Sequence, residues 1–165
     1  MNPASTSQPR ILVVEGEPIA SGILSDLLRM AGYEAVCAGT GEQALLTLMR
    51  ERGRIDAVFT EVDLPGLVDG WMVAEEFRSA RPAGPIVFAA RPGSEAQIGA
   101  GTAVVASPVL PPKVVEALAT LDGKVQEVAR SRCALREIVE ARSEEAIGSA
   151  GPSVVEGPQR VRATG

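Results

Sequence analysis

Two glutamates in the sequence each follow a run of apolar residues of the kind that forms buried strands. Glu61 follows residues 55–60, and Glu15 follows residues 10–14. In open α/β sheets, ligands and reacting groups gather beyond the carboxyl ends of the parallel strands. Carboxylates at such a place can bind a metal ion, exchange a proton or receive a transferred group. Two of them alone do not distinguish between these chemistries.

The residue types that are missing restrict the chemistry further. The chain contains no histidine, which removes the commonest general base near neutral pH and the usual serine or cysteine hydrolase triads. Its two cysteines, Cys37 and Cys133, are far apart in the sequence and form no CxxC motif, so no zinc site of the usual kinds is expected. We interpret both cysteines as reduced thiols of a cytosolic protein.

Length and charge indicate the class of protein. A chain of 165 residues, of which 45% are hydrophobic and 3% aromatic, can bury one core that is mainly aliphatic. The formal net charge of −5 disfavours nucleic acid as a partner, because phosphate contacts require a basic face. The sequence has no signal-peptide pattern and no apolar run near the ~20 residues that a membrane helix needs. We therefore expect a cytoplasmic protein without membrane contact.

Apolar runs and amphipathic segments alternate along the chain, which predicts an α/β fold with a doubly wound, five-stranded parallel sheet. Strands are expected over residues 10–14, 33–38, 55–60, 86–90 and 103–106. Helices are expected after Pro18, from Thr40, over 68–81 and from Pro111, with only a shortened fourth helix within 91–101. The core-facing side of the first helix is expected to comprise Ile19, Ile23, Leu27 and Met30, widened by Leu24 and Leu28.

A second pattern begins in the last predicted helix. Its positions step by four and three in alternation, and they are apolar with the exception of Arg132: Val114, Leu118, Leu121, Val125, Val128, Arg132, Leu135 and Val139. A heptad seam of this length can dimerise as a coiled coil, and the same spacing also suits a terminal helix that folds back on its own domain. Both interpretations stay open. Gly123 weakens such a helix by roughly 1 kcal/mol relative to alanine.

These patterns divide the chain into four parts. Residues 1–9 are expected to be a disordered arm, residues 10–121 the domain, residues 122–147 a C-terminal helical extension, and residues 148–165 a disordered tail. The apolar seam therefore crosses the predicted boundary between the domain and the extension.

Two segments resemble motifs of bacterial response-regulator receiver domains. Residues 13–18 (VVEGEP) resemble the acidic loop of that family, and residues 58–66 (VFTEVDLPG) with Asp69-Gly70 resemble its phosphoacceptor segment. The resemblance implies a flavodoxin-like fold in which an aspartate receives a phosphoryl group from a histidine kinase or a phosphotransferase, with Mg²⁺ held beside it by carboxylates. It also implies a Thr or Ser after the fourth strand and a Lys before a proline after the fifth.

The chain departs from this family pattern at four positions. They are the phosphoacceptor, the second metal-binding acid, the hydroxyl group after the fourth strand and the lysine after the fifth strand. The residues found there are Glu61, Gly16, Ala90 (Ala89 if the register slips by one) and Ser107.

These replacements all act against phosphoryl transfer. The extra methylene of Glu61 misplaces the carboxylate for in-line transfer, and such a misplacement can cost on the order of 10²-fold. Gly16 removes an anionic metal ligand. Ala90 cannot hydrogen-bond a phosphoryl oxygen, and Ser107 supplies no cation to neutralise it. The oxygens that remain, from Glu15, Glu61 and the backbone carbonyl of Asp63, are weak candidates for Mg²⁺. Glu61 then either mimics a phosphorylated aspartate or is a replacement without that role.

The sequence therefore predicts a non-enzymatic signalling module of a two-component or phosphorelay pathway that acts without phosphorylation. The expected partner is a histidine kinase, a phosphotransferase or an output protein, and a homodimer through the C-terminal helix is a further expectation. Because the predicted fourth helix is short, we expect the surface that binds the partner to lie toward the long C-terminal helix instead. The alternative is an active receiver that uses a non-standard carboxylate with Mg²⁺. Asp56, at the other end of the third strand, is expected to lie far from this pocket.

Overall fold

The computed structural model describes residues 8–51, 53–92 and 102–148. Strands and helices alternate along these residues as the sequence predicts. The strands are β1 (Arg10–Val14), β2 (Glu34–Ala38), β3 (Ala57–Glu61), β4 (Ile86–Ala90) and β5 (Thr102–Ala106). The helices are α1 (Pro18–Met30), α2 (Gly41–Arg50), α3 (Gly70–Ala80), α4 (Pro111–Thr120) and α5 (Asp122–Gly148).

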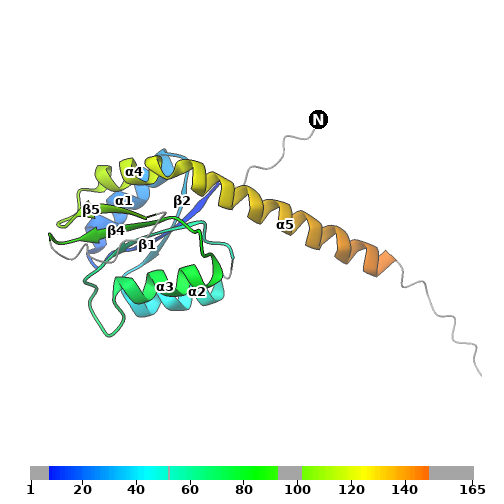
Figure 1. The fold of residues 1–165 in the computed structure, drawn as a ribbon, viewed down its shortest axis with the longest axis horizontal. Helices are drawn as coiled ribbons and strands as arrows, with labels where there is room; N and C mark the ends of the chain where they lie inside the picture. Colours follow the sequence, from blue (N-terminus) through cyan, green and yellow to red (C-terminus); the bar gives the residue numbers. More distant parts are fainter. Residues whose placement is uncertain (1–7, 52, 93–101, 149–165) are drawn as a thin grey trace, which may run out of the picture. The chain divides into compact units, whose positions relative to one another are not determined.

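The five strands form one parallel sheet in the order β2-β1-β3-β4-β5. Helices α1 and α4 cover one face of this sheet, and α2 and α3 cover the other (Figure 1). This arrangement confirms the predicted flavodoxin-like, doubly wound fold. Because all strands run in the same direction, their carboxyl ends meet at a single edge of the sheet.

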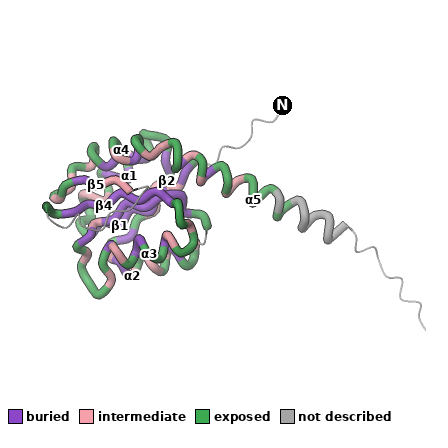
Figure 2. Tube along the Cα trace, in the orientation of Figure 1, coloured by how far each residue is buried: buried purple, intermediate pink, exposed green. Residues whose placement is uncertain are grey.

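The central strands are buried on both faces, as expected for a parallel sheet covered by helices on each side (Figure 2). In β3, Val58 belongs to the core under α2 and α3, whereas its neighbour Phe59 belongs to the core under α1 and α4. Both side chains are fully buried. The alternation follows from the two-residue period of a strand, and it gives the domain two apolar layers with the sheet between them.

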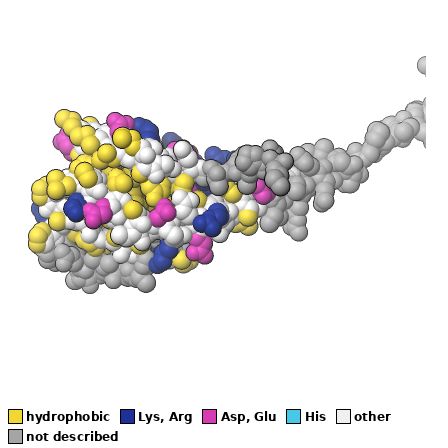
Figure 3. Space-filling view, turned by 90° about the horizontal axis from the view of Figure 1, so that it is seen from above, with side chains coloured by type: hydrophobic (Ala, Val, Ile, Leu, Met, Phe, Trp, Pro, Cys, Tyr) yellow, Lys and Arg dark blue, Asp and Glu magenta, His cyan; other side chains and the backbone are white. Residues whose placement is uncertain are grey.

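The prediction for the core-facing side of α1 is wrong for three of its four main residues, because Ile19, Ile23 and Met30 are 72%, 50% and 84% exposed. The buried residues are Leu24 and Leu28, which were expected to widen that side, together with Ser25. A polar residue is accommodated in the core because the Ser25 hydroxyl donates a hydrogen bond of 2.8 Å to the carbonyl of Ser21. Figure 3 shows hydrophobic side chains among charged ones on one face of the molecule.

The prediction of one continuous helix from Pro111 is also wrong, because the helix breaks at Leu121 between α4 and α5. Val114, Leu118 and Val125 are fully buried in the core beneath α1 and α4. These three predicted interface residues therefore contact their own domain. The heptad spacing did not reveal this, since a core-facing helical stripe repeats with almost the same period.

The remaining seam residues differ in exposure. Leu121 is partly buried against the same core, Val128 has intermediate exposure, and Leu135 and Val139 are 64% and 63% exposed. Contacts divide the chain into a unit of residues 1–133 and a unit of residues 134–165. The first three turns of α5 thus belong to the domain, beyond the predicted boundary at 121.

Three predicted segments fall mostly outside the described residues: the arm at 1–9, the short fourth helix within 91–101, and the tail at 148–165. Of the helices in the part of the chain that the structure describes, none is long and apolar enough to cross a membrane.

Candidate functional site at the carboxyl edge of the sheet

The sheet register brings the predicted pocket residues to one edge. Val14 at the end of β1 pairs with Thr60, so Glu15 emerges beside Glu61 at the end of β3. Ala90 ends β4, and its carbonyl accepts a hydrogen bond of 2.9 Å from the backbone N–H of Ser107, just after β5. Glu15, Gly16, Glu61, Ala90 and Ser107 therefore lie at the carboxyl ends of four adjacent or connected strands, as the sequence predicts.

Two carboxylates, those of Glu15 and Glu61, lie close enough in this pocket for the charge of one to affect the pKa of the other. Glu15 is buried, and its Oε1 accepts a hydrogen bond of 2.9 Å from the backbone N–H of Glu17. Glu61 is half-buried and lies near the backbone N–H of Gly16. Burial raises the pKa of Glu61, and the charge of Glu15 raises it further, while the Gly16 N–H opposes the shift. The pocket thus stabilises one negative charge better than two.

Arg91 is a cation at the pocket that the sequence analysis did not identify. Its Nε lies 3.7 Å from Oδ2 of Asp63, with both side chains largely exposed, and its charge lowers the pKa of Glu61. Arg91 directly follows Ala90, so its position after a strand end was a usable signal. It supplies positive charge to the rim of a pocket that has no lysine at Ser107.

Gly70 packs closely against the backbone at Glu61 and Val62. Its N–H donates a hydrogen bond of 3.0 Å to the carbonyl of Val62, and a Cβ at this position would overlap the carbonyl oxygen of Glu61. Asp69 caps the start of α3 by accepting a hydrogen bond of 2.9 Å from the N–H of Met72. The Asp-Gly pair therefore allows α3 to begin directly against the end of β3.

The loop after Glu61 is held by a carboxylate from α2. Oε1 of Glu42 accepts hydrogen bonds from the backbone N–H of Leu67 at 2.8 Å and of Val68 at 3.3 Å. The Leu67 N–H is the largest cause of a lowered pKa for Glu42. Gly66 has φ +110°, and a Cβ there would collide with the Glu42 carboxylate, so this turn requires glycine.

The donor set falls short of what resident Mg²⁺ would need. Mg²⁺ prefers octahedral coordination by oxygen, with carboxylates supplying its anionic ligands. The pocket offers Glu15, which already accepts a backbone hydrogen bond, and Glu61, while the carboxylate of Asp63 faces Arg91. Within the described ranges, no group of three Asp, Glu, His or Cys side chains is arranged to hold a metal ion. We derive no step that passes through a metal.

A cavity of about 450 Å³ adjoins the pocket between α1 and the end of β2. Glu15 and Gly16 line it just after β1, Ser25 lines it from α1, and Cys37 lines it from β2. The Ser25 Oγ and the Cys37 Sγ are 2.9 Å apart. The carboxyl edge of the sheet is therefore hollowed on the side of β2.

A family model of the response regulator receiver domain matches residues 11–119. The match covers more than half of the chain, and the chain belongs to this family of signalling modules of two-component systems. It is 34% identical over 86 residues to the transcriptional regulatory protein AruR of Pseudomonas aeruginosa, a match that covers 50% of this chain and 35% of AruR. It is 33% identical over 78 residues to the probable transcriptional regulatory protein TcrX of Mycobacterium tuberculosis, covering 47% of this chain and 32% of TcrX.

These matches span about a third of the length of the curated relatives. Among solved structures, a putative response regulator from Chloroflexus aurantiacus is 28% identical with a TM-score of 0.57, covering 70% of this chain and 98% of its own. A receiver protein from Sinorhizobium medicae has a TM-score of 0.62 at 22% identity, covering 78% of this chain and 99% of its own. The latter likeness supports the fold alone.

Proposed function

We propose that this chain is a phosphorylation-independent member of the receiver family, which acts by binding a protein partner and not as an enzyme. The observation that carries the proposal is the presence of Glu61, with its particular surroundings, at the phosphoacceptor position. A glutamate stands at the phosphoacceptor position, half-buried beside the buried Glu15 and near the backbone N–H of Gly16. The neighbouring positions hold Ala90 and Ser107, so the pocket lacks the hydroxyl and the lysine of the family pattern.

Electrostatics support the same proposal. In-line transfer would bring a phosphoryl group into a pocket where Glu15 and Glu61 already repel each other. Arg91 is the cation that lowers the pKa of Glu61, and its side chain is largely exposed at the rim of the pocket. A partly exposed cation is screened by water, so it offsets a buried dianion poorly. We therefore assign Glu61 the role of a fixed charge in a single conformational state.

The proposed partner is a histidine kinase, a phosphotransferase or an output protein of a two-component pathway in the cytoplasm. The relatives named above are transcriptional regulators. This chain spans only about a third of their length, and we propose an output role in which a protein partner recognises the receiver fold.

Treatment with acetyl phosphate and Mg²⁺, followed by intact mass measurement, tests the proposal. We expect the unmodified mass for the wild-type chain and for Asp63→Asn. A phosphoryl adduct on the wild-type chain would contradict the proposal. Loss of that adduct in Asp63→Asn would favour the alternative, an active receiver that uses Asp63 as a non-standard acceptor.

A homodimer through α5 is a second proposal, and the exposure of Leu135 and Val139 favours it. Apolar residues spaced by four on a helix can form the seam of a coiled coil. The proposal now concerns residues beyond 133, because Val114, Leu118 and Val125 are buried in the domain. Sedimentation equilibrium should show dimers in the wild-type chain and monomers in Leu135→Ser/Val139→Ser. A wild-type monomer at high micromolar concentration would exclude this dimer.

A further inference from the structure

A buried carboxylate lies at the amino-terminal edge of the sheet, at the opposite end of β3 from Glu61. Asp56 precedes β3 and is fully buried. Its Oδ2 accepts a hydrogen bond of 2.9 Å from the backbone N–H of Arg10 and lies 3.1 Å from Nη2 of Arg132. Nη2 of Arg81 is 3.9 Å from its Oδ1. A buried carboxylate needs such partners, since transferring an unpaired charge out of water is costly.

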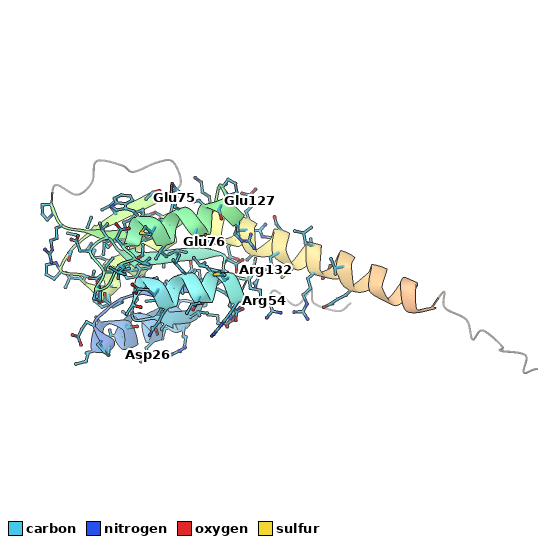
Figure 4. All side chains as sticks on the ribbon, turned by 90° about the horizontal axis from the view of Figure 1, so that it is seen from below. Asp26, Arg54, Glu75, Glu76, Glu127 and Arg132 are labelled. Carbon is cyan, nitrogen blue, oxygen red and sulfur yellow. The ribbon has the colours of Figure 1, made fainter. Side chains whose placement is uncertain are left out.

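Arg132 reaches this edge from α5. Its side chain is 15% exposed, and in addition to Asp56 it donates hydrogen bonds to the backbone carbonyls of Arg54 at 3.3 Å and of Gln8 at 3.5 Å. Figure 4 shows Arg132 beside Arg54. This contact explains the one polar residue in the apolar seam: Arg132 occupies a core-facing position of α5 because its partner is a buried acid.

The first turns of α5 are also tied to the domain at their start. The hydroxyl of Tyr33, at the entry to β2, donates a hydrogen bond of 2.7 Å to Oδ1 of Asp122. Between Asp122 and Arg132, Val125 and Ala129 are buried at 0% and 3% exposure. The spacing of these four residues, three, four and three, places them on one face of the helix. Residues 122–132 thus bury one stripe with a polar contact at each end.

The two polar contacts are not equivalent. The Tyr33–Asp122 contact joins the start of α5 to the entry of β2, whereas Arg132 makes its contacts one residue before the compact unit ends at Cys133. Between these two contacts Val125 and Ala129 are the buried apolar side chains, so the position of the end of this segment depends on Arg132. A buried ion pair adds little net stability in comparison with apolar packing. It can still favour one arrangement of the chain strongly, because a buried charge without its partner costs free energy.

We propose that Asp56 and Arg132 form a latch that holds residues 122–133 of α5 on the amino-terminal edge of the sheet. With the latch closed, Val125 and Ala129 are buried against their own domain. With the latch open, this segment detaches while the sheet stays folded, and its apolar stripe becomes accessible together with Leu135 and Val139. The latch thus decides between the two arrangements that the heptad spacing allows, a helix folded back on its domain and a helix with a free seam.

Hydrogen exchange measured by mass spectrometry on the full chain tests the latch. The variants are Arg132→Gln, Asp56→Asn and the double variant. Arg136→Gln is the matched control, because Arg136 is 79% exposed and pairs with Glu140 on the same helix. We expect the amides of residues 125–133 to exchange at least tenfold faster in either single variant and in the control less than twofold faster. The amides of β1 and β3 should keep their protection.

The double variant separates the latch from two independent effects. If Asp56 and Arg132 act as one unit, losing both should accelerate exchange at 125–133 no more than losing one. Additive acceleration would overturn the latch, and so would exchange within twofold of wild type in Arg132→Gln. Equal loss of protection in β1 and β3 would also overturn it, because the ion pair would then support the whole fold and not the position of α5.

Discussion

The backbone N–H of Gly16, in the loop after β1, lies near the carboxylate of Glu61 at the end of β3 and opposes the rise in the pKa of that carboxylate. In this arrangement the residue at the second metal-acid position contributes a donor instead of a second negative charge. The glutamate therefore has a polar neighbour within the chain itself. This relationship leads to two predictions about the pocket.

The first prediction concerns the pH dependence of stability. The pKa of Glu61 is raised above its ordinary value of 4.5, so the folded chain holds this proton more tightly than the unfolded chain does. The favourable contribution is then fully present below pH 4.5 and is lost as the pH rises through the folded pKa. Glu61→Gln removes the charge, and its free energy of unfolding should exceed that of wild type at neutral pH.

Urea denaturation at several pH values checks this prediction. The difference between Glu61→Gln and wild type should shrink as the pH falls toward 4.5. Glu75→Gln is the control, since Glu75 is an exposed glutamate on α3 and its replacement should leave stability nearly unchanged at either pH. A Glu61→Gln variant that is less stable than wild type at neutral pH would show that the ionised carboxylate is stabilising.

The second prediction is that phosphoryl acceptance can be restored only as a set. The combined variant Gly16→Asp, Glu61→Asp, Ala90→Thr and Ser107→Lys should gain a phosphoryl adduct from acetyl phosphate and Mg²⁺. At Gly16 there is space, because the nearest atom to an added Cβ is Cδ of Pro65 at 3.5 Å. Glu61→Asp alone should label slower by on the order of 10²-fold or more, since positioning and charge neutralisation both contribute to the rate.

The matched control for restoration keeps Glu61 and changes only the other three positions. Intact mass and circular dichroism should show a folded protein without an adduct. Labelling of that control would mean that Glu61 itself or another carboxylate accepts the phosphoryl group, and it would contradict the argument that the longer side chain at position 61 prevents transfer.

A third prediction concerns the close approach of Gly70 to Glu61. In Gly70→Ala the new methyl group would overlap the Glu61 carbonyl, and we expect the free energy of unfolding to fall by about 1–3 kcal/mol. Gly22→Ala is the matched control, because Gly22 lies inside α1 with no atom within 4 Å of an added Cβ. That change should raise stability by roughly 0.5–1 kcal/mol. Urea denaturation that gives both variants the same sign would contradict this account.

A fourth prediction uses the fact that Tyr33 is the only tyrosine of the chain. Burial raises the pKa of its phenol, and the hydrogen bond to Asp122 and the charge of Asp122 raise it further. Ultraviolet absorbance should therefore show phenolate forming well above the ordinary value of 10.0. In Asp122→Asn the transition should move toward lower pH while staying above that value, since burial remains. An unchanged transition would show that the Tyr33–Asp122 contact is absent in solution.

Strand positions could be predicted from the sequence because buried parallel strands are short, continuous apolar runs. β1 and β4 have the predicted bounds, and β3 is shifted so that Glu61 ends the strand instead of following it. The pocket followed from the strand ends, since parallel strands place their carboxyl ends at one edge. What could be foreseen there was the location of Glu61, and not the influence of the Gly16 N–H and of the Arg91 charge on its pKa.

Helix faces were harder to predict, because hydrophobicity alone does not distinguish core from surface. Ser25 is buried in α1 while Ile19 is exposed, a choice made by hydrogen bonding to Ser21 and by the direction in which α1 crosses the sheet. Arg132 was read as a break in an apolar seam, and its reason is a carboxylate 76 positions earlier in the chain. Pairings at such separation leave no local signal in a single sequence.

β3 carries one acid near each end, Asp56 before it and Glu61 as its last residue. A strand rises about 3.3 Å per residue, so these acids are separated by roughly 16 Å along one extended segment without a turn, and the residues between them are all buried. One strand therefore carries the glutamate of the pocket at one end and, before the other end, the aspartate that pairs with Arg132 of α5.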